Sequence, residues 1–253
     1  MKRTRTALAA PALVLVATMA LSGCGDSDSD SSSSDSSDSR SDSKGSAKSP
    51  GSSEKTADPA ATLSRAALTK NEVEGYTVKK PDTKYAFATA QDQVKLDKAV
   101  CAPLAYATNQ LPLGTPKADL IRLATGAKGP ADFTYVTLAT YASGEAKTTL
   151  ADLSKAVRSC GTGFSAKANG NSGSYSSVTA ENAPTPSGAD ESLAFRVTTK
   201  YKGVTHTMRA QAARHGDTIA VYYAVDGMAF TQARPGNAEI GRAVVKTQSA
   251  KLP

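Results

Sequence analysis

Apolar and polar residues alternate through much of the second half of the chain, and this alternation predicts antiparallel strands. Three successive segments carry apolar side chains on one face: Leu193, Phe195 and Val197; Val204, Met208 and Ala210; Ile219, Val221, Tyr223 and Val225. Polar turns at 202–203 and 215–217 separate these segments, so they should form a meander. Residues 75–80, 119–125 and 132–142 are expected to add strands to the same sheet.

Apolar residues at helical spacing predict further elements between and after these strands. The expected helices are 60–70, about 93–109, 144–160 and 237–249. Pro103 should break or kink the second helix, and Ser143 should cap the third. Residues 169–177, rich in Gly, Ser and Asn, and residues 181–189, with two prolines, should be loops. The pattern predicts an α+β fold, with helices packed on one face of an antiparallel sheet.

The N-terminus has the features of a secretory signal. A basic start at Lys2, Arg3 and Arg5 precedes a mostly apolar run over 7–21, which is too short to span a membrane comfortably. The run ends at Leu21-Ser22-Gly23-Cys24, which resembles a bacterial lipobox. This resemblance implies that diacylglycerol is attached to the Cys24 thiol and that cleavage leaves Cys24 as the mature N-terminus. The alternatives are an ordinary secreted protein with a spare cysteine, or an uncleaved anchor.

The chain therefore divides into three parts: a lipoprotein signal peptide (1–23), the lipidated cysteine with a Ser/Asp-rich tether (24–58), and one extracellular domain (59–253). No large apolar side chain occurs from 25 to 58, so burial cannot offset an ordering cost of about 1–2 kcal/mol per residue, and the tether should be disordered. Of the net charge of +7, the signal carries +3 and the tether −4, which leaves +8 on the domain. This positive charge suits anionic envelope partners, and the alternative is that it only solvates the domain. The expected extracytoplasmic location argues against nucleic acid as a partner.

One of the three cysteines, Cys24, lies in the N-terminal signal, and the other two lie in the domain. With Cys24 lipidated, Cys101 and Cys160 remain in an oxidising compartment, where an even number of thiols indicates a disulfide. The alternative, a metal or redox pair, lacks a C-x-x-C spacing and a nearby histidine. We therefore expect one disulfide that joins the helices carrying Cys101 and Cys160.

No motif in the sequence supports catalysis. Within the predicted domain (59–253), G-x-S-x-G, S-x-x-K, H-E-x-x-H and Walker-type glycine loops are all absent. His206 and His215 are an odd number of positions apart, so on one strand they would lie on opposite faces and could not share a metal. We expect no enzyme activity, no catalytic residue, no cofactor and no metal site.

The best candidate surface is the outer face of the meander. Alternation places Arg196 beside Arg209 there, with Tyr222 in range. If a helix or loop rises beside this face, the guanidinium groups and the ring would form an anion or glycan site. The alternative is a solvated sheet face, which antiparallel sheets commonly show.

Three short stretches of the domain resemble the extracellular sensor domains of actinobacterial PknH-type serine/threonine kinases and their stand-alone lipoprotein relatives. The stretches are 100–104 around Cys101, 140–160 through Cys160, and 189–194 at the start of the meander. The resemblance implies a twisted antiparallel sheet and a cleft that binds an envelope ligand, but the chain has no kinase domain and no second domain disulfide. The sequence thus predicts a non-catalytic ligand-binding or sensor-like lipoprotein at the extracytoplasmic face of the cell membrane. The alternative is a structural module that docks another envelope protein.

Overall fold

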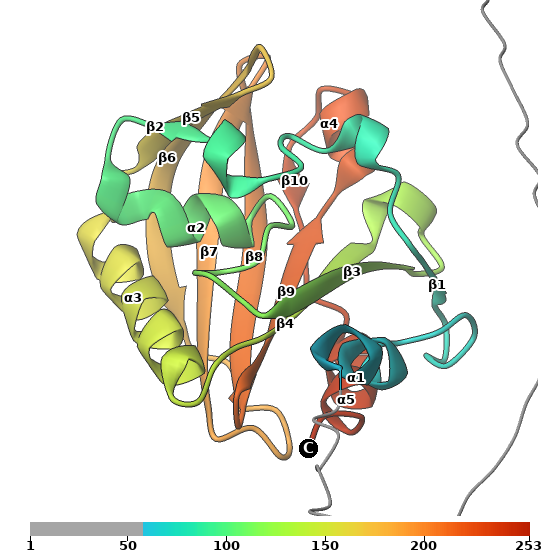
Figure 1. The fold of residues 1–253 in the computed structure, drawn as a ribbon. Helices are drawn as coiled ribbons and strands as arrows, with labels where there is room; N and C mark the ends of the chain where they lie inside the picture. The colour runs from blue at the N-terminus through green and yellow to red at the C-terminus, as the bar shows by residue number, and fades with distance from the viewer. Residues whose placement is uncertain (1–57) are drawn as a thin grey trace, which may run out of the picture. The chain divides into compact units, whose positions relative to one another are not determined.

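The computed structural model describes residues 58–253. The predictions for the signal peptide, for Cys24 and for the tether up to residue 57 lie outside the described residues. The described part has a ten-stranded sheet and five α-helices, so the predicted α+β class is confirmed (Figure 1).

Nine strands form a continuous antiparallel path in the order β1-β3-β4-β9-β8-β7-β6-β5-β2, and β10 pairs with β8 in parallel. The strands are β1 (Thr77–Lys79), β2 (Lys95–Leu96), β3 (Ala118–Thr125), β4 (Phe133–Thr140), β5 (Phe164–Ala168), β6 (Asn171–Glu181), β7 (Glu191–Tyr201), β8 (Val204–His215), β9 (Thr218–Val225) and β10 (Gly236–Asn237). The predicted meander is confirmed as β7, β8 and β9, which pair in sequence order.

The helices are short, apart from one. They are α1 (Pro59–Ala66), α2 (Ala102–Ala107), α3 (Glu145–Ser159), α4 (Gly227–Thr231) and α5 (Arg242–Ser249), with 3-10 turns η1 (Thr83–Tyr85), η2 (Gln91–Gln93), η3 (Ala99–Cys101) and η4 (Gly129–Ala131). The predicted helix over 144–160 is confirmed as α3, but its N-cap is Gly144 with a left-handed φ of 79°, and Ser143 does not cap it.

Three predicted helices are shorter in the structure. The first, predicted over 60–70, ends at Ala66 as α1. Only α2 forms a regular helix within the range 93–109, because Pro103 lacks an N–H and is accommodated only in the first turn of a helix. Residues upstream instead form β2, which pairs with β5. At the C-terminus, residues 236–237 pair with β8 as β10, so the last helix starts only at Arg242.

The prediction of a loop over 169–177 is wrong for most of that range. Residues 171–181 form β6, which lies between β5 and β7 in the sheet. Its Ser- and Gly-rich sequence has a low intrinsic preference for strand, but Tyr175 and Val178 are buried and both of its edges are paired. Pairing and burial therefore outweigh the local preference.

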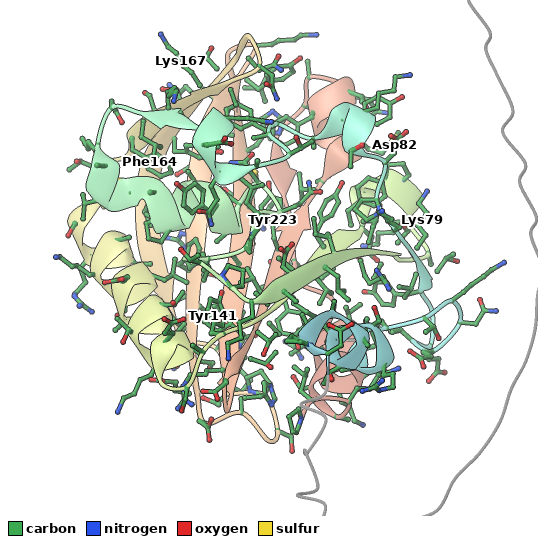
Figure 2. The ribbon with its side chains drawn as sticks, viewed as in Figure 1. Lys79, Asp82, Tyr141, Phe164, Lys167 and Tyr223 are labelled. Atoms are coloured by element: carbon green, nitrogen blue, oxygen red, sulfur yellow. A yellow bond between two sulfur atoms is a disulfide. The ribbon has the colours of Figure 1, made fainter. Side chains whose placement is uncertain are left out.

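The helices pack on both faces of the sheet, not on one as expected. On one face, α2 and α3 cover a large core that includes Phe164 and Tyr223, which lie inside this layer in Figure 2. On the other face, α1 and α5 cover a second core, which includes Tyr222. Two layers are needed because β9 is apolar at nearly every position, so neither of its faces can be left to solvent.

The predicted disulfide is present between Cys101 and Cys160, whose Cα atoms are 6.0 Å apart. It joins the end of η3, just before α2, to the C-cap of α3, so it ties together the two helices of the larger core. Both cysteines are fully buried.

We predict that replacing both Cys101 and Cys160 with Ala lowers the free energy of unfolding by about 4 kcal/mol, because the crosslink closes a loop of 59 residues in the unfolded chain. Urea unfolding followed by circular dichroism measures this difference. The reduced wild-type protein is the matched control and should unfold near the midpoint of the double variant. An unchanged midpoint in both would contradict a stabilising role for the bond.

Candidate ligand-binding site

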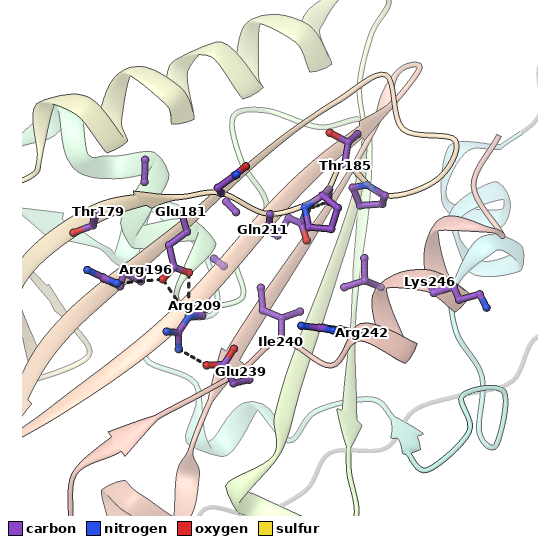
Figure 3. Close-up of a pocket in the computed structure, with 18 of the residues that line it drawn as sticks. Thr179, Glu181, Thr185, Arg196, Arg209, Gln211, Glu239, Ile240, Arg242 and Lys246 are labelled. Carbon is purple, nitrogen blue, oxygen red and sulfur yellow. Dashed lines mark hydrogen bonds and ion pairs between the residues drawn. The ribbon is translucent and has the colours of Figure 1, made fainter.

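A cavity of about 940 Å³ lies on the outer face of β6, β7 and β8, on the side of the sheet that carries α5 (Figure 3). The strand ladders place Glu181, Arg196, Arg209 and Gln211 on this face. Arg196 pairs with Arg209, Gln211 lies two positions from Arg209, and Glu181 pairs with Ala194, which lies two positions from Arg196. The loop 182–187 forms one wall, and residues 239–246, at the start of α5, form the other. The wall that a binding site on this face requires is therefore present on both sides.

The loop wall is held by a hydrogen bond near its middle and by ion pairs just beyond its C-terminal end. The Gln211 side-chain amide donates to the Pro184 carbonyl over 2.9 Å, which ties the loop to the floor of the cavity. Past the loop, Arg214 forms ion pairs with Asp190 at 2.8 Å and with Glu191 at 2.6 Å. The two prolines of the loop, Pro184 and Pro186, limit its backbone freedom further.

A network of four charged residues closes one end of the cavity. Arg196 and Arg209 are directly opposite each other on β7 and β8, an arrangement that would be repulsive by itself. Glu181 lies between them, 3.0 Å from Arg209 and 3.5 Å from Arg196, and Glu239 lies 2.9 Å from Arg209. Two carboxylates thus balance two guanidinium groups, and the network is neutral as a whole.

The two arginines of this network differ in how available they are. The Arg209 side chain is only 18% exposed, and it also donates to the Asn237 side chain and to the Ala238 carbonyl, each over 2.7 Å. Its donors are therefore used to hold the segment that leads into α5. The Arg196 side chain is 47% exposed and has one long contact with Glu181, so it can still reach a ligand.

The surplus positive charge of the cavity comes from α5. Arg242 and Lys246 are four positions apart on this helix, both line the cavity, and both are exposed (Figure 3). Neither forms an ion pair with any residue of the range 58–253. Arg242 is also the first residue of α5, where the helix dipole favours anions over cations. Helix stability therefore does not explain a cation at this position.

The structure places Tyr222 on the predicted face but not in the site, so its assignment as a ligand-binding residue is wrong. Its ring is fully buried among α1 and α5 residues, and its hydroxyl lies 3.0 Å from the Ser249 Oγ. Burial raises the pKa of Tyr222 to about 12. Alternation along β9 correctly predicted the face but not the helix that covers it.

The contribution of α5 to the site was not predicted. Arg242 and Lys246 lie on one face of the predicted C-terminal helix, and this basic pair was a readable signal. The polar face of a helix usually contacts solvent, however, and no local pattern shows that this one lies beside the outer face of β8.

The two histidines lie on opposite faces of β8, as predicted, but both are buried. Neither ring nitrogen of His206 or His215 has a hydrogen-bond partner within the described part of the chain. His206 stacks on Phe230 with the ring centroids 3.9 Å apart. Among residues 58–253, no group of three or more His, Cys, Asp or Glu side chains is arranged to hold a metal ion.

Large apolar side chains are mostly buried. The exposed ones among the described residues are Tyr85, Val100 and Tyr201, which come from three separate elements. Within residues 58–253, none of the helices combines the length and hydrophobicity that a membrane span requires.

No protein-family model and no curated protein matches this sequence. Among solved structures, the extracellular domain of PknH from Mycobacterium tuberculosis is similar with a TM-score of 0.42 and 9% identity, over 76% of this chain and 85% of that one. An uncharacterized protein from Mycobacterium smegmatis, the Rv0999 ortholog, is similar with a TM-score of 0.31 and 12% identity, over 64% of this chain and 78% of that one. Both TM-scores are low.

We predict that the buried histidines make stability depend on pH. Burial lowers the pKa of both His206 and His215, although Asp226 and Asp190, respectively, oppose this shift. The unfolded chain then binds protons below about pH 6.5 that the folded chain does not bind, so stability is full above this pH and is lost as the pH falls below it.

Urea unfolding of the wild type and of the His206→Gln plus His215→Gln variant, between pH 7.5 and 5.0, measures this effect. The free energy of unfolding of the wild type should fall by up to about 1.4 kcal/mol per histidine for each pH unit below 6.5. The variant should be less stable at pH 7.5 but should show a flatter profile. Parallel profiles would contradict the assignment to these two residues.

Proposed function

We propose that this protein is a lipoprotein anchored through Cys24 at the extracytoplasmic face of the cell membrane, and that its domain binds an anionic envelope ligand without catalysing a reaction. The cavity beside α5 is the proposed binding site. Arg242, Lys246 and Arg196 are the proposed anion-binding residues. Arg196 keeps the ligand-binding role predicted for it, whereas Arg209 positions the segment that leads into α5.

The observation that carries this proposal is the imbalance of charge in the cavity. The cavity is lined by four basic and two acidic side chains. The two acidic ones are already paired with Arg209, which leaves the cations of α5 without an anion inside the described domain. A phosphate or carboxylate placed between the loop wall and α5 would supply that anion through charge-assisted hydrogen bonds.

The chemistry of the lining favours binding over catalysis. It has no histidine and no cysteine, and its two carboxylates are both held in ion pairs with Arg209. Both carboxylates are engaged by the Arg209 guanidinium, so neither is free to act as a general base on a ligand. The residues present can orient and neutralise an anion, which is what a binding protein needs.

The proposed anchor fits the same picture. The N-terminal sequence through Cys24 resembles a lipobox, and residues 25–58 separate this cysteine from the domain. A lipid on Cys24 would then keep the domain at the extracytoplasmic face of the membrane. Two acyl chains on Cys24 would make this anchoring stable.

We predict that Cys24 carries the lipid. Cells fed an alkyne analogue of palmitate should label the wild-type protein. Cys24→Ser should abolish the label, because the other two cysteines, Cys101 and Cys160, are joined in a disulfide. Cys101→Ser plus Cys160→Ser is the matched control and should keep its label. Label retained in Cys24→Ser would contradict the anchor.

We predict that the cations of α5 retain the ligand. Residues 24–253 with Cys24→Ser, secreted from an actinobacterial host and measured by native mass spectrometry, should show an adduct. Arg242→Gln plus Lys246→Gln should reduce its occupancy by about tenfold or more, because both charge-assisted contacts are lost. Lys147→Gln plus Lys155→Gln on the exposed side of α3 removes the same charge away from the cavity and should have no effect.

Two results would contradict this assignment. An adduct that survives the α5 variant would place the ligand elsewhere. A wild-type spectrum without any adduct would favour the alternative function, in which the domain docks another envelope protein.

A further inference from the structure

The walls of the cavity beside α5 are apolar over much of their area, although its rim is charged. Ala183, Pro184 and Pro186 line it on the loop side, and Ile240 and Val245 line it on the α5 side. These two walls face each other across the outer surface of the sheet (Figure 3). A ligand that is only an anion would leave these walls in contact with water.

The floor of the cavity offers few free polar groups. Ala194 on β7 is nearly fully buried, and Gln211 on β8, its direct neighbour in the ladder, uses its side-chain N–H on the Pro184 carbonyl. At one end, the neutral network around Arg209 closes the cavity. The part between these groups is therefore suited to an apolar ligand segment.

The cations without an ion pair in the described domain are confined to one side of the cavity. Arg242 and Lys246 both belong to α5 and flank Val245, so the apolar wall and the positive charge are adjacent on one helix. This arrangement fits a molecule with an apolar body and an anionic group at one end. The volume of about 940 Å³ is at the upper end of the range for small-molecule sites, which is ample for one long chain.

We propose that the ligand is an anionic amphiphile, a lipid with an acyl chain between the loop wall and α5 and a phosphate-type headgroup on Arg242 and Lys246. This inference rests on the proposed function and specifies its ligand class. The chain contacts Pro184, Pro186 and Val245, and the headgroup stays at the rim, where the two cations are exposed. Binding then requires both parts of the ligand.

The test uses three probes that separate charge from chain. Palmitoyl lysophosphatidylglycerol has both, glycerol phosphate has only the anion, and palmitoyl lysophosphatidylcholine has the chain without net charge. Isothermal titration below the critical micelle concentration, with residues 24–253 carrying Cys24→Ser, measures each affinity. Lysophosphatidylglycerol should bind about a hundredfold more tightly than glycerol phosphate and about tenfold more tightly than lysophosphatidylcholine.

Two variants assign these differences to the two sides of the site. Arg242→Gln plus Lys246→Gln should reduce the affinity for lysophosphatidylglycerol to that for lysophosphatidylcholine and leave the latter unchanged. Val245→Ser should weaken both lipids alike, because it removes apolar wall and no charge. Lys147→Gln plus Lys155→Gln, on α3, is the matched control and should behave like the wild type.

The outcomes separate this inference from the proposed function. If glycerol phosphate binds as tightly as the anionic lipid, and the α5 variant weakens both, an anion site exists but the amphiphile class is wrong. If the two lipids bind equally and the α5 variant has no effect, both the amphiphile and the anion site are wrong. If none of the probes binds, the amphiphile class is overturned, while an adduct in native mass spectra still decides the proposed function.

Discussion

Strand β9 is buried on both faces, and the positions of the other elements follow from this constraint. It lies between β4 and β8, and its residues from Thr218 to Ala224 are all buried. Ile219, Val221 and Tyr223 face the larger core, which α2 and α3 cover. Ala220 and Tyr222 face the opposite side, so a second helical layer must exclude water there.

The second layer is fixed to β9 and to itself by buried hydrogen bonds. The Tyr222 hydroxyl meets the Ser249 hydroxyl at the end of α5. The Gln248 side chain accepts from the Leu68 N–H and donates to the Ala66 carbonyl, which joins α5 to the end of α1. These bonds hold α5 over β9. The side of α5 that carries Arg242 and Lys246 lies beside β8, and the cavity lies between this side of the helix and the polar outer faces of β6 and β7. Arg209 completes the arrangement by holding the segment that enters α5.

Elements with strong local patterns could be predicted from the sequence, and those set by neighbours could not. The meander, α3 and the Cys101–Cys160 disulfide were predictable, because alternation, helical spacing and cysteine number are local signals. Strand β6 was missed because its Ser, Gly and Asn residues favour turns, and only its two paired neighbours make it a strand. The candidate site shows the same division. Alternation predicted that Arg196 and Arg209 share a face, but it could not show that Glu181 neutralises them or that α5 covers Tyr222 and brings Arg242 to the cavity.

The central claim is that the space between the loop 182–187 and the start of α5 is a binding site for an anionic, partly apolar ligand. Hydrogen exchange measured by mass spectrometry, with and without palmitoyl lysophosphatidylglycerol, tests it directly. With the lipid bound, amide exchange should be slower in two separated segments, 182–187 and 239–246, and unchanged in α3. Protection confined to other segments, or unchanged exchange at a lipid concentration that saturates binding, would contradict it.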